Sequence, residues 1–393
     1  MHVNPLVDST EFPPVTEAAG WIKDRTFPAD LPLINVSQAV PGYPTSDDVL
    51  AHMAEVLREP QVSMYGHALG LPALRKAYAE HICDLHKANA PAQVSEANIA
   101  ITAGCNQAFH VAITAMAQTS DQVILPTPWY FNHKMSLDMH GVETVPLYCR
   151  AENKMIPDVT DAEALITDKT RAIVLITPNN PTGQEYPPET INAFYHLCRA
   201  RNITLILDET YRDFRTDTSS SCHNVFEDTQ WHSHAIHLYS FSKAYALAGY
   251  RTGAIAASEK FLHEVTKVLD CVSICAPQLS QRAALFALQN AQQWKQDRCT
   301  QMHQRAAAFS DSLRQHNHGY QITAIGSYFA YLQHPYEQSA RDVARFLSDE
   351  ANLLALPGEM FGPRQEQHIR IAFANVSRAV MPEITRRLAD IRL

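Results

Sequence analysis

Residues 235–253, AIHLYSFSKAYALAGYRTG, place a lysine directly after a short apolar run. The run 235–239 is almost continuously apolar, which is typical of a strand buried on both faces of a parallel sheet. Lys243 stands between two serines, and Arg251 follows eight residues later. Because α/β proteins bind ligands at the carboxyl ends of their parallel strands, this stretch predicts a polar site at a sheet edge.

Similar apolar runs recur through the middle of the chain, with helical stretches between them. The runs QVILP, AIVLIT, TLILD and GAIAAS predict further strands of the same sheet. Residues 188–202 have the apolar spacing that is expected of a crossover helix. The sequence therefore predicts an α/β fold, in which a large domain has a mostly parallel central sheet flanked by helices and a smaller domain is α+β.

The pattern along the chain suggests three parts. Residues 1–45 are rich in proline and predict an arm that contributes to the small domain. Residues 46–280 hold the strand and helix pattern of the large domain. Residues 281–393 begin with a long stretch of helix formers, a connecting helix with or without a break, and continue into the C-terminal small domain.

The composition argues against several classes of protein. With 32 basic and 41 acidic residues, the formal net charge is −9 and no basic stripe is present, so nucleic-acid binding is not expected. No apolar run is long enough to span a bilayer, and the first residues do not resemble a secretory signal. The eight cysteines are scattered without a CxxC pair, which favours a cytoplasmic location over a disulfide framework.

Polar side chains follow the ends of several predicted strands, and we expect these ends to lie side by side. A small-residue turn after NIAIT opens a helix, and the other strands are followed by Asn180, Asp208, Tyr211, Ser240, Ser242 and Lys243. This set suits a pyridine ring that carries a phosphate and an aldehyde. The lysine would form a Schiff base with the aldehyde, the aspartate would keep the ring nitrogen protonated, and the helix N-terminus would bind the phosphate.

In these motifs the sequence resembles the pyridoxal-phosphate-dependent aminotransferases of class I/II (fold type I), from about residue 35 to residue 373. The resemblance implies that Lys243 is the Schiff-base lysine and proton shuttle. It implies that Asp208 is the partner of the ring nitrogen, and that Tyr211 and Asn180 contact the ring oxygen. The cofactor's phosphate and ring face would be contacted by Gly104, Cys105, Asn106, Tyr130, Ser240, Ser242, Arg251 and, from a neighbouring subunit, Tyr65.

The resemblance also assigns residues to the substrate. Arg370 in IRIAFA matches the arginine that pairs with the substrate's α-carboxylate through two parallel hydrogen bonds. Asn180 would share this site. Ala39 stands where the family often has a glycine whose backbone N–H meets the substrate carboxylate, and it could narrow the pocket.

Other positions bear on the substrate's side chain. Asn106 stands where some relatives have a lysine that binds a side-chain carboxylate, which weakens a preference for aspartate. Trp129, Tyr43 and Tyr65 favour an aromatic-lined pocket, with Trp129 at its wall. An aromatic or broad specificity is therefore expected.

The resemblance implies ping-pong transamination between an amino acid and a 2-oxo acid, with pyridoxal 5'-phosphate as cofactor and a homodimer with shared active sites. Two alternatives stay open. The same cofactor could serve a lyase, cyclase or oxidase acting on an amino acid, or the chain could be a regulatory module without catalysis. Relatives of the regulatory kind carry a preceding DNA-binding segment, and a family pattern that begins near residue 35 disfavours that alternative.

The stretch WHSHAIH, residues 231–237, is the one histidine cluster that suggests a metal. His232 and His234 would share a strand face, with His237 following. They precede the strand and so lie at the far end of the sheet from the predicted site, and we expect no metal there.

Overall fold

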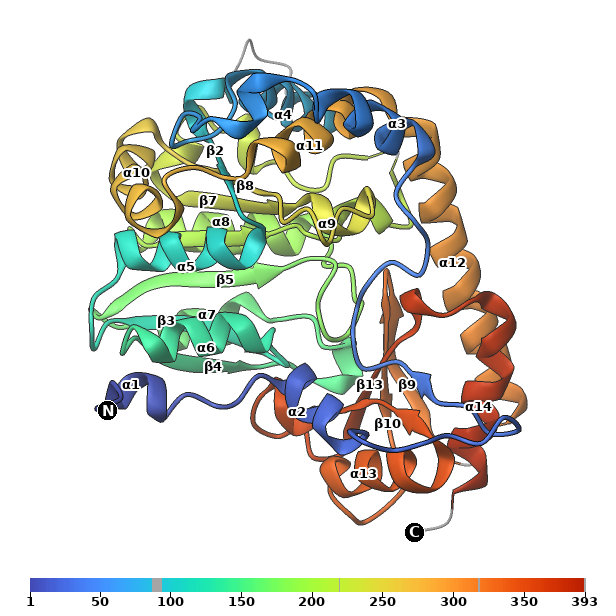
Figure 1. Cartoon of the computed structure of the whole chain (residues 1–393). Coiled ribbons are helices and arrows are strands. Elements are labelled where there is room, and N and C mark those ends of the chain that lie inside the picture. The colour runs from blue at the N-terminus through green and yellow to red at the C-terminus, as the bar shows by residue number, and fades with distance from the viewer. Residues whose placement is uncertain (87–93, 219, 317–318, 392–393) are drawn as a thin grey trace.

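The computed structural model describes residues 1–86, 94–218, 220–316 and 319–391 (Figure 1). Within these residues, a seven-stranded sheet with the order β2-β8-β7-β6-β5-β3-β4 forms the centre of the large domain. Its strands are β2 (Ile99–Thr102), β3 (Gln122–Thr127), β4 (Glu143–Tyr148), β5 (Thr170–Ile176), β6 (Thr204–Asp208), β7 (Ala235–Ser240) and β8 (Gly253–Ala256). The pairs from β7 to β4 are parallel, which confirms the predicted α/β class.

The direction of β8 differs from the prediction. The sequence predicts residues 253–258 as one more parallel strand, but β8 is antiparallel to both β7 and β2, with Ser240 opposite Gly253. A parallel return would need a crossover, usually through a full helix, whereas residues 241–252 form only the short helix α9 (Phe241–Ala244) and turns. Because β8 lies between β2 and β7, the end of β2 is not a direct neighbour of the other predicted strand ends.

Both faces of the large sheet are buried. In β6, Leu205 and Leu207 belong to the hydrophobic core on one face, while Ile206 belongs to the core on the other. This two-sided burial explains the nearly continuous apolar runs in the sequence. One face carries α5 (Cys105–Met116), α6 (Phe131–Met139) and α10 (Glu259–Ser273); the other carries α3 (Asp47–Val56), α4 (Pro72–Leu85), α7 (Val159–Leu165), α8 (Pro188–Ala200) and α11 (Gln278–Asn290) (Figure 1).

The predicted crossover helix and the predicted connecting helix are both present in the structure. The crossover helix over residues 188–202 is α8, which begins with a proline in its first turn and buries Ile191, Phe194 and Tyr195. The connecting helix is broken at Ala291, where α11 ends and α12 (Gln292–Gln315) begins. Figure 1 shows α12 running from the helices above the large sheet down to the small domain.

The small domain is built on an antiparallel sheet with the order β12-β13-β10-β9. The N-terminal arm joins it through β1 (Ile34–Asn35), which pairs in parallel with β11 (Leu353–Leu354). The expected division near residues 45 and 280 stays a prediction. The remaining elements of these parts are α1 (Pro5–Asp8), α2 (Pro14–Trp21), β9 (Gln321–Gly326), β10 (Phe329–Gln333), α13 (Ala340–Ala351), β12 (Leu356–Pro357), β13 (His368–Ala372) and α14 (Met381–Asp390).

The search for membrane-spanning segments covered the described residues. None of the helices in this part of the chain combines the length and the apolar character that crossing a membrane requires.

Candidate active site

A cavity of about 370 Å³ lies where the carboxyl ends of β5, β6 and β7 face β13 and the N-terminal arm. Most of the predicted site residues line it: Ala39, Cys105, Asn106, Tyr130, Asn180, Asp208, Tyr211, Ser240, Ser242, Lys243, Arg251 and Arg370. Gly104 directly precedes this lining as the N-cap of α5. Tyr65 does not line it, because its side chain is 80% exposed on the surface of this subunit.

Lys243 enters the cavity from α9, immediately after β7. Its Nζ donates a hydrogen bond to the backbone oxygen of Ala39 at 2.5 Å. Burial lowers the pKa of Lys243 to about 8, and the positive charges of Arg370 and Arg251 lower it further in the same direction. At pH 7 about a tenth of the amine is therefore neutral, far more than in an unperturbed lysine, and the neutral amine is the form that acts as a nucleophile or a base.

Asp208 ends β6, and its carboxylate faces the cavity. Oδ1 accepts a hydrogen bond from the backbone N–H of Thr210 at 2.9 Å, and Oδ2 lies 3.3 Å from His133 Nε2. Burial alone would raise the pKa of Asp208, but the interactions with His133 and Thr210 outweigh it and hold the pKa below the ordinary value. Asp208 is therefore an ionised, buried hydrogen-bond acceptor in the lining of the cavity.

The sequence analysis missed His133. This residue lies three positions after Tyr130, one turn along α6, and its ring stacks on Phe109 with centroids 3.9 Å apart. The helical spacing from Tyr130 is the signal that could have placed it beside the cavity.

Arg370 lies in β13 and reaches the cavity from the small domain. Its Nη1 donates a hydrogen bond to Asn180 Oδ1 at 3.0 Å, and its Nη2 donates to the backbone oxygen of Ser37. Burial lowers the pKa of Arg370 to about 10, so the guanidinium stays charged at neutral pH. Nε has no hydrogen-bond partner among the described residues, which leaves a buried donor for a carboxylate.

The N-terminus of α5 forms an anion site with the segment around β8. Gly104 caps α5 with φ +88°, and the Arg251 side chain lies beside it, with Nη1 donating to the backbone oxygen of Ala248 at 3.1 Å. A Cβ on Gly253 would lie 2.6 Å from the Gly104 carbonyl carbon, so the backbones meet closely there. Free backbone N–H groups at a helix N-terminus next to an arginine suit a phosphate.

Two tyrosines complete the polar lining. The Tyr130 hydroxyl donates a hydrogen bond to Asn106 Oδ1 at 3.2 Å, and burial raises the pKa of Tyr130 to about 12. Burial also raises the pKa of Tyr211 well above its ordinary value, so its phenol keeps its proton and can donate it to a ring oxygen. Ser240 Oγ accepts a hydrogen bond from the Ser242 backbone N–H at 3.2 Å and so caps α9.

Two residues of the expected aromatic lining, Trp129 and Tyr43, are not among the residues that line the cavity. Tyr65 is exposed on the surface of this subunit, so its contact with a partner's cavity stays a prediction. Trp129 packs against Gly362, and the Tyr43 hydroxyl lies 3.0 Å from that of Tyr328. The aromatic residues that do line the cavity are Tyr130, Phe131 and Tyr211. Sequence spacing did not predict this set, because the direction of each ring depends on how α6 and the end of β6 pack.

The N-terminal arm contributes residues that the sequence analysis did not single out. Pro13 and Val15, at the start of α2, line the cavity together with Gln38 and Val40. Nothing in their residue types suggested chemistry. They enter the site because the arm packs over it.

The donor set of this cavity fits pyridoxal phosphate. An ionised carboxylate, a protonated phenol and a lysine of lowered pKa face one space, and the helix N-terminus with Arg251 closes one end of it. Glycines at 104 and 253 allow the Arg251 side chain and the start of β8 to approach the N-terminus of α5 closely.

Comparisons with known proteins agree with this geometry. A family model described as aminotransferase class I and II matches residues 32–388. An aromatic aminotransferase of Arabidopsis thaliana is 26% identical over 392 residues, covering 94% of this chain and 95% of that protein. An aspartate aminotransferase of Sulfolobus acidocaldarius is 25% identical over 369 residues, covering 91% and 89%. The aspartate aminotransferase of Thermus thermophilus, solved with maleate, superposes with a TM-score of 0.88 at 21% identity over 99% of both chains.

Proposed function

Because this chain belongs to the class I and II aminotransferases, we propose that it transfers the amino group of an aromatic or other uncharged amino acid to a 2-oxo acid. Enzymes of this family depend on pyridoxal phosphate, and the named relatives are aminotransferases. The single observation that carries the choice of donor is the charge distribution of the cavity.

Each positively charged side chain in the cavity already has a role in the proposed reaction, so none of them is left to bind a second substrate carboxylate. Arg251 lies at the anion site of α5, Arg370 offers a buried donor to an α-carboxylate, and Lys243 is the reacting amine. Among the described residues that line the cavity, no further lysine or arginine faces a second carboxylate. An acidic donor side chain would lose its hydration there without an ionic partner, which is unfavourable.

The rest of the lining suits an apolar side chain. Pro13, Val15 and Phe131 line the cavity together with Tyr130. The relatives include both an aromatic and an aspartate aminotransferase, so their names alone do not decide the donor.

The proposed mechanism assigns each step to a side chain of this protein. When bound, pyridoxal phosphate supplies an aldehyde that takes up the amino group and a ring that stabilises negative charge on the neighbouring carbon. Asp208 holds a proton on the ring nitrogen, and Tyr211 donates a hydrogen bond to the ring oxygen. Arg370, held by Asn180, orients the substrate through its α-carboxylate. Lys243 Nζ, which is partly neutral because its pKa is lowered, would take the proton from the substrate's Cα and deliver it to the carbon that was the cofactor's aldehyde carbon.

We further propose that the enzyme is a homodimer in which Tyr65 completes the partner's phosphate site. Tyr65 is 80% exposed, and the exposed apolar residues include its neighbour in the chain, Met64, and also Val272 and Ile274, which flank Ser273. Met64, Tyr65 and Ser273 line one shallow cavity, so these residues form a connected surface patch. Exposed apolar patches of this kind mark protein contacts.

We also propose a cytoplasmic location. All eight cysteines are free thiols, and three of them, Cys105, Cys198 and Cys222, are buried. Free thiols accord with a reducing compartment.

A panel of amino donors, followed through the visible absorbance of the bound cofactor, tests the proposed function. We expect phenylalanine or tyrosine to change the absorbance and aspartate to act poorly. Asn106→Lys should then improve aspartate by about tenfold or more, since it adds a cation in the cavity. Asn106→Met, which adds length without charge, is the matched control and should not improve aspartate. Release of ammonia from an amino acid when no 2-oxo acid is present, or equal use of aspartate by the unmodified enzyme, would contradict the proposal.

A further inference from the structure

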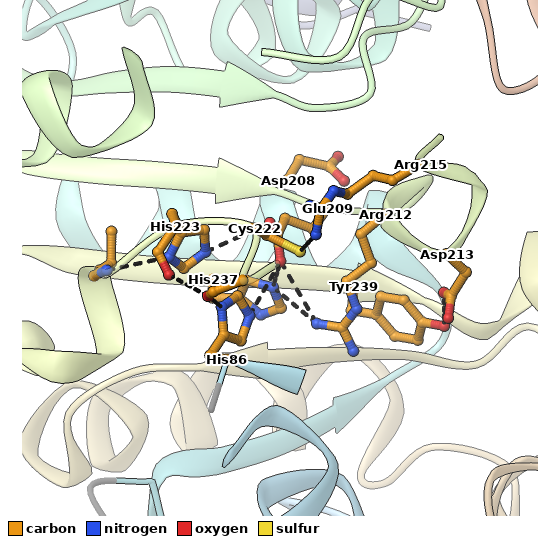
Figure 2. Close-up of polar contacts among 12 residues, drawn as sticks. His86, Asp208, Glu209, Arg212, Asp213, Arg215, Cys222, His223, His237 and Tyr239 are labelled. Atoms are coloured by element: carbon orange, nitrogen blue, oxygen red, sulfur yellow. Dashed lines mark hydrogen bonds and ion pairs between the residues drawn. The ribbon is translucent and has the colours of Figure 1, made fainter. Parts of the chain in front are cut away.

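Glu209 directly follows Asp208, but its carboxylate lies in a separate buried cluster and does not line the candidate active site (Figure 2). Three histidines surround it: His86 at the end of α4, His223, and His237 in β7. His237 Nε2 lies 2.9 Å from Glu209 Oε2, His223 Nε2 lies 3.4 Å from Oε1, and His86 Nε2 lies 3.8 Å from Oε2. All four side chains are almost completely buried.

The cluster was not foreseen from the sequence. The histidines that drew attention there were His232, His234 and His237, and the structure separates them. His232 lies in a short 3-10 helix (Trp231–Ser233) before β7, whereas His237 lies in β7 with Nε2 2.9 Å from Glu209 Oε2. The members at 86, 209 and 223 are far apart along the chain, so no local motif marks them.

A metal ion is the first occupant to consider, because ligand atoms of His86, Glu209 and His223 lie within 4.8 Å of one another. Two observations argue against it. The Arg212 guanidinium places a positive charge 3.6 Å from Glu209 Oε2. In addition, His223 Nδ1 accepts a hydrogen bond from the Val225 backbone N–H at 3.2 Å, so the ring's proton is on Nε2, the atom that faces Glu209. A histidine that binds a metal through Nε2 has the opposite arrangement.

These contacts instead describe a buried carboxylate that is hydrogen-bonded to His237 Nε2 and faced by His223 Nε2 and the Arg212 guanidinium. Burial alone would raise the pKa of Glu209, but His223 and His237 outweigh it and hold the pKa well below the ordinary value. Burial lowers the pKa of His86 and of His237, so both rings are neutral. The ionised Glu209 and the charged Arg212 balance each other, and no added cation is needed.

We propose that Glu209 is a positioning residue. Its buried side chain, on the side of the segment away from the cavity, holds in place the residues that present Asp208 and Tyr211 to the cofactor. Backbone hydrogen bonds tie Glu209 to both β7 and the rest of this segment. The Glu209 N–H donates to the Leu238 oxygen at 2.9 Å, and the Arg212 N–H donates to the Glu209 oxygen at 3.1 Å. This inference rests on the proposed function, because it takes Asp208 and Tyr211 to be the groups that contact the cofactor.

Arg212 and Asp213 hold the far end of the same segment. The Arg212 guanidinium lies 4.2 Å from the ring centre of Tyr239, whose hydroxyl donates a hydrogen bond to Asp213 Oδ2 at 2.7 Å. Lys295 Nζ, from α12, donates to Asp213 Oδ1 at 2.7 Å. Residues 209, 212 and 213 are thus fixed in the protein interior, while residues 208, 210 and 211 of the same segment line the cavity.

Glu209→Gln in the holoenzyme tests the proposal, since it keeps the shape of the side chain and removes its charge. Arg212 is then left without its balancing carboxylate, so we expect the amides of residues 208–214 to exchange with deuterium about tenfold faster or more. The pH midpoint of the cofactor's visible absorbance should shift, and kcat should fall more than KM changes, because Asp208 and Tyr211 are less well aligned.

A matched control removes a buried polar contact in the small domain. Ser312 Oγ lies 2.6 Å from Thr385 Oγ1, and Thr385→Val breaks this contact far from the cavity. We expect Thr385→Val to lower Tm without changing the exchange of residues 208–214 or the absorbance midpoint.

Two results would overturn the proposal. If Glu209→Gln lowers Tm but leaves the exchange rates and the absorbance midpoint unchanged, Glu209 serves stability only. If the purified unmodified protein contains stoichiometric zinc that His86→Ala removes, the cluster is a metal site. Failure of the proposed function is separate: it would appear as irreversible labelling of the Lys243→Ala variant by pyridoxal phosphate and borohydride, and the exchange measurement does not depend on that result.

Discussion

The amine of Lys243 is less basic than that of a lysine in water. Burial removes the solvent that would stabilise the charged form, and Arg370 and Arg251 disfavour a third positive charge nearby, so the pKa falls to about 8. The same two arginines are the proposed partners of the substrate carboxylate and the cofactor phosphate. The cations that bind the anionic ligands therefore also make the lysine a better nucleophile.

We expect the apoprotein to attach pyridoxal phosphate at a rate that rises with pH, with a midpoint of about 8. Below the midpoint the Lys243 amine is protonated and cannot attack the aldehyde, whereas above it the amine is neutral, so the rate increases as the pH increases. Rapid-mixing measurements of visible absorbance over a pH series give this midpoint.

A pair of arginine variants checks the cause of the shift. Arg370→Met removes a positive charge near the amine and should move the midpoint to higher pH. Arg364→Met is the control and should not move the midpoint. Arg364 is exposed, its guanidinium packs over the Tyr148 ring at 3.8 Å from the ring centre, and it does not line the cavity. A midpoint near 10.5 in the unmodified protein would show that the site does not perturb Lys243.

At the scale of elements, the contact between β8 and α5 decides whether the anion site is open. Gly253 begins β8, and a Cβ there would lie 2.6 Å from the Gly104 carbonyl carbon and 2.7 Å from the Cys105 nitrogen. Because β8 returns antiparallel beside β7, it brings Gly253 against the first turn of α5. The antiparallel direction of one strand thus places the backbone groups that we propose as the phosphate site.

Gly253→Ala should weaken binding of pyridoxal phosphate by about tenfold or more, since the added methyl group must displace the backbone at the α5 N-terminus. Absorbance titration of the apoprotein with pyridoxal phosphate measures this. Gly249→Ala is the control from the same segment: no atom lies within 4 Å of a Cβ there, so cofactor affinity should be unchanged. Equal effects of the two substitutions would refute the close-approach argument.

At the scale of the whole molecule, the cavity depends on parts of the chain that are distant in sequence. The arm supplies Pro13, Val15 and Ala39, the large sheet supplies Asp208 and its neighbours, and the small domain supplies Arg370. Arg370 and Asn180, which are 190 positions apart, share a hydrogen bond across the cavity. Motion of the small domain relative to the large sheet would therefore change substrate binding directly.

The proposed dimer extends this dependence to a second chain and can be tested by mixing two inactive variants. Lys243→Ala removes the reacting amine and Tyr65→Ala removes the residue proposed to reach the partner's site. In a mixed dimer one site carries both changes and the other carries neither. Random exchange should therefore restore about a quarter of the unmodified activity, since half of the dimers are mixed and each has one intact site.

The activity before mixing gives the control for this experiment. Each variant alone should be less active than the mixture after subunit exchange. If mixing restores no activity although subunit exchange is demonstrated, for instance by mass spectrometry, Tyr65 does not act across an interface.

The sequence by itself determined the fold class, the family resemblance and most of the residues in the cavity. Apolar runs reveal strands buried on both faces, and polar residues directly after such runs lie at the carboxyl edge whatever the strand order. Lys243 and Asp208 were found in this way, because their positions depend on local pattern alone.

Only the tertiary structure decided which side chains meet. The antiparallel direction of β8, the rings that line the cavity, the contact of His133 with Asp208 and the buried cluster around Glu209 could not be read from spacing. The physical reason is that periodicity records how deeply each residue is buried, whereas contacts between distant residues depend on strand order, strand direction and helix packing, which the free energy of the whole fold selects.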